Sequence, residues 1–200
     1  MMVLVPGVTA LLASAMFLAV ARGDGRLSPS EQHAGAALGS ALVALAATFA
    51  VLFRGPRDYP QIEILAGALV VSAWTDLRLG LILDRVTAPA LLLVVIFCAL
   101  EGAAAASLFG ILGSAGVVVA LHAITRGRGI GLGDAKLAAV IGAGLGAYGG
   151  GLALACAFVI AALVNSALLF MHRVTMGDRV AFGPYLAWGS VVAIALGAAR

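Results

Sequence analysis

The chain has 200 residues, of which 63% are hydrophobic and only 10% are charged, and its mean hydropathy is +1.14. A soluble domain of this size cannot bury so much apolar surface, so the composition excludes that class and predicts an all-α polytopic membrane protein. The net charge of +3 comes from loop arginines, and in a membrane protein such a bias reports orientation rather than nucleic-acid binding.

Apolar stretches recur along the chain at lengths close to the roughly 17–25 residues that span a bilayer. They predict a bundle of about eight transmembrane helices. The expected helices are 2–21, 34–53, 61–76, 87–101, 103–124, 133–149, 150–170 and 182–198. The sixth and seventh are separated only by Gly149, Gly150 and Gly151, which predicts a tight helical hairpin there.

Small residues are spaced by four along two of these stretches, and such ridges let helix backbones approach closely. One ridge contains Ala138, Gly142, Gly146 and Gly150, and the other contains Ala106, Gly110 and Ser114. We interpret both as packing surfaces.

The basic residues sort to one side of the predicted membrane. If the loop that holds Arg126 faces the cytoplasm, alternation of the helices places nine of the twelve Lys and Arg residues on that side. The positive-inside rule then predicts that both termini are outside and that the loop before Asp134 is inside, although Arg54 and Arg57 oppose this orientation.

Two acids are candidates for chemistry because each lies at the cytoplasmic end of a predicted helix. Asp76 ends the third stretch and Asp134 opens the sixth, so both are expected at similar depth. Two adjacent carboxylates cannot both ionise cheaply and share a proton, which suits acid–base hydrolysis of an amide. The alternative for each acid is a helix cap or a solvated ion pair. No GxSxG, HExxH or CxxC motif occurs in the sequence, and we expect no metal and no cofactor.

Three motifs in the same order give these acids a context. The segment Ile130 to Leu137 resembles the GxGDxKL signature of the type IV prepilin peptidases, which are GxGD aspartic membrane proteases. The segment Asp76 to Pro89 resembles the first-aspartate segment of that family, with Leu83 in place of a proline before Asp84. The segment Phe182 to Gly189 resembles the late PFGPxLAxG motif, with Ala181 in place of its first proline.

This resemblance implies that Asp76 and Asp134 are the catalytic pair of an aspartic-type leader peptidase. It implies site-shaping or substrate-binding roles for a second set: Arg78, Asp84, Gly131, Gly133, Lys136, Phe182, Gly183 and Pro184. Lys136 is the only lysine, and we expect it to tune Asp134, to hold a substrate carbonyl or to anchor the helix at the interface.

The resemblance also implies a substrate and a location. The substrate would be a prepilin or pseudopilin whose short basic leader, usually ending in glycine, precedes a hydrophobic helix lying in the bilayer. The enzyme would be a multi-pass protein of the inner membrane with its site facing the cytoplasm. The residues alone leave two alternatives open, a proton-coupled transporter and a non-catalytic subunit of a secretion system.

We expect one integral membrane peptidase domain over residues 1–200. Residues 1–60 would form two peripheral helices joined by a short loop, and residues 61–200 would form the catalytic core. Members of the family carry a sizeable cytosolic domain after the first helix, where this chain has only the segment Arg22 to His33. We therefore expect a short, peptidase-only form without N-methyltransferase activity.

Overall fold

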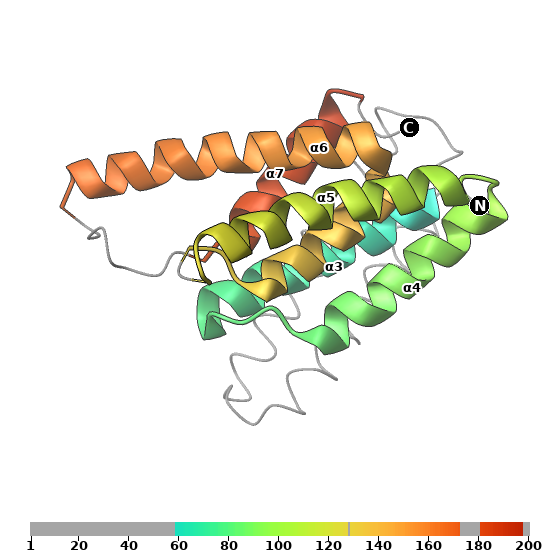
Figure 1. Cartoon of the computed structure of the whole chain (residues 1–200), viewed down its shortest axis with the longest axis horizontal. Coiled ribbons are helices and arrows are strands. Elements are labelled where there is room, and N and C mark those ends of the chain that lie inside the picture. The colour runs from blue at the N-terminus through green and yellow to red at the C-terminus, as the bar shows by residue number, and fades with distance from the viewer. Residues whose placement is uncertain (1–58, 128, 173–180, 198–200) are drawn as a thin grey trace, which may run out of the picture.

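The computed structural model describes residues 59–127, 129–172 and 181–197, and within these ranges it contains helices and no strand (Figure 1). Five helices follow one another: α3 (Tyr59–Leu79), α4 (Asp84–Leu100), α5 (Ala104–Ile124), α6 (Leu132–Phe170) and α7 (Gly183–Ala195). The all-α prediction is confirmed for these residues. The predicted helices 2–21 and 34–53 and the loop Arg22 to His33 lie outside the described residues.

The helix count departs from the prediction because 133–149 and 150–170 are joined in α6. The described ranges hold five helices where six stretches were expected, so the bundle of about eight is not supported there. The expected hairpin at Gly149 to Gly151 is wrong, since these glycines are helical. The break lies instead at Gly146, whose φ of 75° and ψ of −176° are open mainly to glycine.

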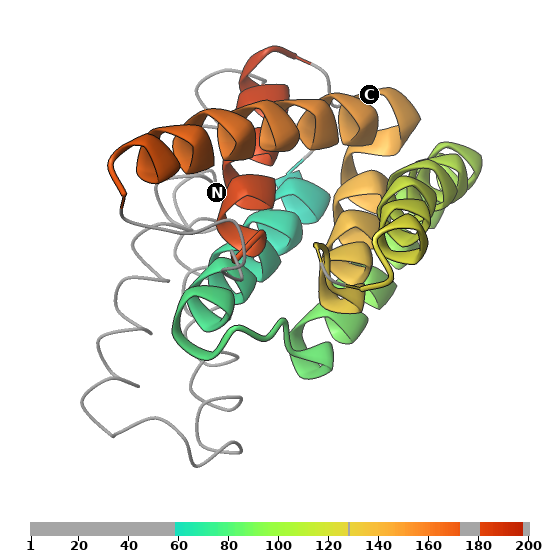
Figure 2. The same cartoon turned by 60° about the vertical axis from the view of Figure 1, so that its left-hand side comes forward.

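The break at Gly146 turns α6 sharply. A straight helix of 39 residues would extend roughly 58 Å at 1.5 Å per residue, about twice the thickness of a bilayer core. The chain instead folds back, and a Cβ added to Gly150 would lie 3.0 Å from the Cα of Gly142. Figures 1 and 2 both show the segment after the turn running in a new direction across the bundle.

Glycines on α5 and α6 pack backbone against backbone at this turn. A Cβ added to Gly110 would overlap the carbonyl of Gly142 and lie 2.8 Å from the carbonyl carbon of Gly146. A Cβ on Gly150 would overlap the hydroxyl of Ser114. The predicted close packing of the two ridges is confirmed, except that Ala106 is exposed and its neighbour Ser107 is buried instead.

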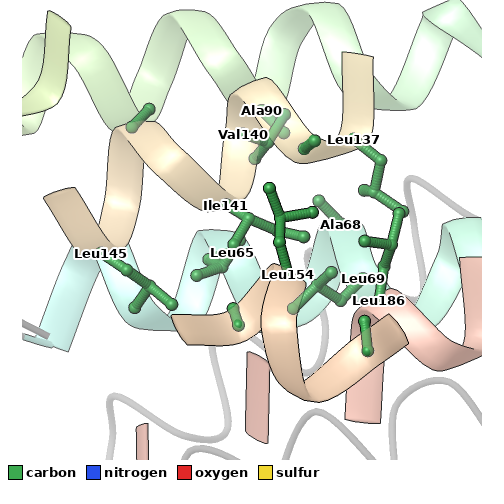
Figure 3. Packing of buried hydrophobic residues seen from close by; sticks show 14 of the residues in the cluster. Leu65, Ala68, Leu69, Ala90, Leu137, Val140, Ile141, Leu145, Leu154 and Leu186 are labelled. Carbon is green, nitrogen blue, oxygen red and sulfur yellow. The ribbon is translucent and has the colours of Figure 1, made fainter. Parts of the chain in front are cut away.

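The core forms around α6, which packs against α3, α4, α5 and α7. Its fully buried side chains meet those of α3 and α7 in one apolar cluster (Figure 3). The largest of them are Leu65, Leu137, Ile141, Leu145 and Leu186. This central position holds the start of α6, and with it Asp134, against the ends of the neighbouring helices.

Large apolar side chains also cover much of the outer surface. Leu100 of α4, Phe109 of α5 and Phe170 of α6 are 77%, 65% and 87% exposed. Two described helices, α5 and α6, are long and apolar enough to cross a membrane. Exposed apolar surface of this extent is typical of proteins that face lipid rather than water.

Candidate active site

Asp76 lies one turn from the end of α3 and is only 8% exposed. Its Oδ2 atom accepts a hydrogen bond of 2.8 Å from the backbone N–H of Gly183, the first residue of α7. A helix N-terminus presents unpaired N–H groups and a partial positive charge, both of which stabilise a carboxylate. The contact joins two segments 107 residues apart in the sequence.

The first turn of α7 directs its one unpaired N–H toward that carboxylate. Pro184 has no N–H, and the N–H groups of Tyr185 and Leu186 both donate to the carbonyl of Phe182. Gly183 alone is left to donate outside the helix. A side chain would not fit there, because a Cβ on Gly183 would lie 2.9 Å from Oδ2 and 3.1 Å from Cβ of Asp76.

Asp134 occupies the third position of α6 and is 7% exposed. Its Oδ2 atom accepts a hydrogen bond of 2.9 Å from the N–H of Gly131, the N-cap residue. This is the acidic half of a capping box, and glycine has no side chain to supply the other half. The helix-cap interpretation of Asp134 is therefore correct as far as its hydrogen bond goes, but a cap does not require burial.

The two carboxylates lie close enough for the charge of Asp76 to act on Asp134. Each uses Oδ2 for a backbone hydrogen bond, and across residues 59–127, 129–172 and 181–197 no group is hydrogen-bonded to either Oδ1. Each aspartate is thus held in place by one oxygen while the other is left for water or a ligand. The arrangement provides two oriented carboxylates, which acid–base catalysis requires.

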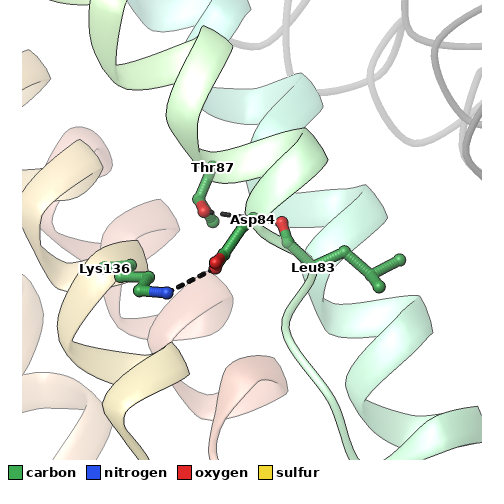
Figure 4. A network of polar contacts seen from close by, with 4 residues as sticks. All are labelled: Leu83, Asp84, Thr87 and Lys136. Carbon is green, nitrogen blue, oxygen red and sulfur yellow. Dashed lines mark hydrogen bonds and ion pairs between the residues drawn. The ribbon is translucent and has the colours of Figure 1, made fainter.

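Asp84 and Lys136 form an ion pair beside this site rather than joining it (Figure 4). Lys136 Nζ lies 2.5 Å from Asp84 Oδ1, and the two side chains are 49% and 69% exposed. The pair links the first turn of α4 to the second turn of α6. This contact with Asp84 is none of the three roles expected for Lys136, and those roles stay predictions.

Four more predicted site residues contact residues other than the two aspartates. Gly133 packs against the loop before α4, where an added Cβ would lie 3.0 Å from Cβ of Ile82. Phe182 is buried, and its ring centroid is 5.0 Å from that of Phe158. The exposed guanidinium of Arg78 lies 5.1 Å from the ring centroid of Trp74. Pro184 lines an apolar groove beside α3.

His122 has a positioning role that the sequence did not reveal. Its Nδ1 lies 2.7 Å from the carbonyl oxygen of Ile130, the residue before the Gly131 cap. The ring also packs on Gly127, whose positive φ of 72° allows the turn out of α5. His122 therefore holds the loop that leads to Asp134. An isolated histidine at the end of an apolar helix carries no pattern that predicts such a contact.

Fold and site together define a helical membrane protein with two buried, backbone-anchored carboxylates at the ends of packed helices. The chain belongs to the type IV leader peptidase family, whose family model matches residues 63–166. That range contains both Asp76 and Asp134, and the family predicted from the three motifs is confirmed.

One similar curated protein is a prepilin leader peptidase/N-methyltransferase of Stutzerimonas stutzeri. It is 31% identical over 149 residues, which cover 66% of this chain and 50% of the relative. The chain thus spans about half the length of the curated relative it matches. No solved structure gives a significant match to the chain.

Proposed function

We propose that the protein is an aspartic-type endopeptidase that removes the basic leader from prepilin-like proteins. The observation that carries the proposal is the pair of buried aspartates, Asp76 and Asp134, each fixed through Oδ2 by a backbone N–H at the start of a helix. Membership of the type IV leader peptidase family supports the reaction class. The peptidase would form one integral membrane domain over residues 1–200, with its catalytic core in 61–200.

The proposed reaction adds water across an amide bond of the substrate. One carboxylate takes a proton from the attacking water while the other, in its protonated form, donates a proton to the carbonyl oxygen. The tetrahedral intermediate then collapses, the C–N bond breaks and the leaving nitrogen takes up a proton. Anchoring by Gly131 and Gly183 fixes both side chains before substrate arrives, so little reorganisation is needed.

The proposed substrate is a prepilin or pseudopilin with a basic leader ending in glycine and a following hydrophobic helix. That helix would lie in the bilayer against the exposed apolar surface of the peptidase. The distribution of basic residues supports an inner-membrane location with the aspartates facing the cytoplasm. This face would bring them level with the junction between leader and hydrophobic helix.

Co-expression with a prepilin-like protein tests the proposal. Membranes containing the wild-type chain should convert the precursor to the shorter mature form, whereas Asp76→Asn and Asp134→Asn should leave the precursor intact at equal protein levels. Full cleavage by either variant would refute the dyad. Failure of the wild type on every prepilin tried would favour the non-catalytic subunit.

A proton-coupled transporter is the weaker alternative. Such a protein needs ionisable groups along a path through the membrane. Asp76 and Asp134 instead lie near helix ends, close enough for the charge of Asp76 to act on Asp134.

A further inference from the structure

His122 and Asp134 are hydrogen-bonded to opposite ends of the same peptide group. The Nδ1 atom of His122 lies 2.7 Å from the carbonyl oxygen of Ile130. The N–H of the next residue, Gly131, donates a hydrogen bond of 2.9 Å to Oδ2 of Asp134. This carbonyl and this N–H belong to one peptide bond, which is planar and stiff. Two hydrogen bonds and a single rigid unit therefore connect the histidine to the aspartate.

The direction of the first hydrogen bond is fixed by its acceptor. A carbonyl oxygen only accepts, so Nδ1 of His122 carries a proton and donates the hydrogen bond to Ile130. Hydrogen bonds in a chain polarise one another, so a donor at the carbonyl of a peptide makes the N–H of that peptide a better donor. The contact from His122 thus strengthens the hydrogen bond that holds Asp134.

The imidazole ring of His122 is itself held at the end of α5. A Cβ added to Gly127 would lie 3.1 Å from Cε1 of the ring, so the ring packs against the backbone of the turn. The N–H of Gly127 also donates a hydrogen bond of 2.9 Å to the carbonyl of His122. Because its ring and its carbonyl both contact the turn, His122 presents Nδ1 from a fixed position.

The peptide group between Ile130 and Gly131 is weakly constrained by the chain around it. Gly129 and Gly131 lie on either side of Ile130, and Gly131 is the N-cap of α6 without a side chain that could bond to the helix. Rotation of this peptide plane would carry the N–H away from Oδ2 of Asp134. A contact at the carbonyl end opposes that rotation.

We propose that His122 is a positioning residue for the reaction and acts on Asp134 through the Ile130–Gly131 peptide group. The inference rests on the proposed function and adds to it a residue of α5, a helix that carries neither aspartate. Fixing Oδ2 of Asp134 also fixes the direction of Oδ1, the oxygen left for water or a ligand. Small displacements of a reacting group lower the rate strongly, so the effect of His122 falls on kcat rather than on KM.

Two substitutions separate the donor of His122 from its ring. His122→Phe keeps an aromatic ring beside Gly127 but has no donor. His122→Asn keeps a donor, because its amide nitrogen is bonded to Cγ as Nδ1 is. In cleavage of a prepilin-like substrate by purified protein in detergent, His122→Phe should lower kcat by about 5- to 20-fold, as for the loss of one hydrogen bond, with KM within about twofold. His122→Asn should keep kcat within about twofold of the wild-type value.

Thr125→Val is the matched control, because it also removes a hydrogen bond at the end of α5. The Thr125 hydroxyl donates to the carbonyl of Leu121 at 2.8 Å and lies 3.3 Å from the carbonyl oxygen of His122. Neither contact includes the peptide group that holds Asp134. Thr125→Val should therefore cleave at the wild-type rate. His122→Leu, which also lacks a donor, takes the place of His122→Phe if that variant does not accumulate.

Each result has a definite meaning. Wild-type kcat in His122→Phe, or a change confined to KM, would overturn the positioning role while leaving the peptidase intact. An equal loss of kcat in His122→Asn or in Thr125→Val would also overturn it, because general damage to the end of α5 would then explain the loss. Absence of cleavage by the wild type would overturn the proposed function and this inference with it.

Discussion

Replacing Gly183 by alanine should impair catalysis although both aspartates remain in the sequence. The added Cβ would lie 2.9 Å from Oδ2 of Asp76 and 3.1 Å from its Cβ. Rotation of the carboxylate relieves the first contact but not the second, since Cβ is fixed to the backbone of α3. The start of α7 must therefore move away, and the 2.8 Å hydrogen bond to Asp76 lengthens or breaks.

The size of the effect follows from the kind of bond that is lost. A hydrogen bond to a charged group contributes about 1.5–3 kcal/mol. If that energy orients Asp76 for the reaction, its loss lowers kcat by about 10- to 150-fold, because 1.4 kcal/mol corresponds to a factor of ten. KM should change much less, since Gly183 has no side chain with which to bind substrate.

Cleavage of a prepilin-like substrate by purified variants measures this directly. Gly151→Ala is the control, because its Cβ would have no atom within 4 Å and alanine favours the helix. The control should cleave at the wild-type rate. Wild-type kcat in Gly183→Ala would refute the claim that this glycine positions Asp76.

Two further predictions concern stability. Gly110→Ala should lower the melting temperature in detergent by several degrees, since overpacking costs about 1–3 kcal/mol. Gly113→Ala on the same helix is the control and should leave the melting temperature unchanged, because its Cβ would have no atom within 4 Å. Equal melting temperatures of the two variants would contradict the packing at the turn. Asp84→Lys and Lys136→Asp should each destabilise the fold by at most about 1 kcal/mol, because the pair is exposed to solvent. The double variant with the two residues exchanged should recover most of that loss. A loss of several kcal/mol from either single change would contradict a solvent-screened pair.

The sequence predicted the helical class, most helix positions and the two aspartates. These follow from local signals: runs of apolar residues mark helices, and charges interrupt such runs only at a cost. The three ordered motifs added the family, because a bare GxGD in so glycine-rich a chain is a weak signal. The motifs identify the family, but they do not establish the role of each residue within them.

The turn in α6 was misplaced because several glycines compete for it. Gly146, Gly149, Gly150 and Gly151 are all able to break a helix, and sequence alone ranks the run of three first. Contact of Gly146 with Gly110 on α5 accompanies the actual break, and such a long-range backbone contact leaves no local pattern.

The hydrogen bond from Gly183 to Asp76 escaped prediction for a similar reason. It is a main-chain contact between residues 107 positions apart, and any residue has an N–H. Lys136 was expected to act on Asp134 or at the interface, but its reach toward Asp84 depends on how α4 packs against α6.

The central claim is that Asp76 and Asp134 act as one catalytic unit, and single-turnover cleavage of a prepilin-like substrate tests it most directly. With enzyme in excess, Asp76→Asn and Asp134→Asn should each lower the rate by at least about 100-fold, and the double variant should be no slower than the worse single one, because residues that act together are not additive. Losses that multiply in the double variant, or a near wild-type rate in either single variant, would contradict the claim.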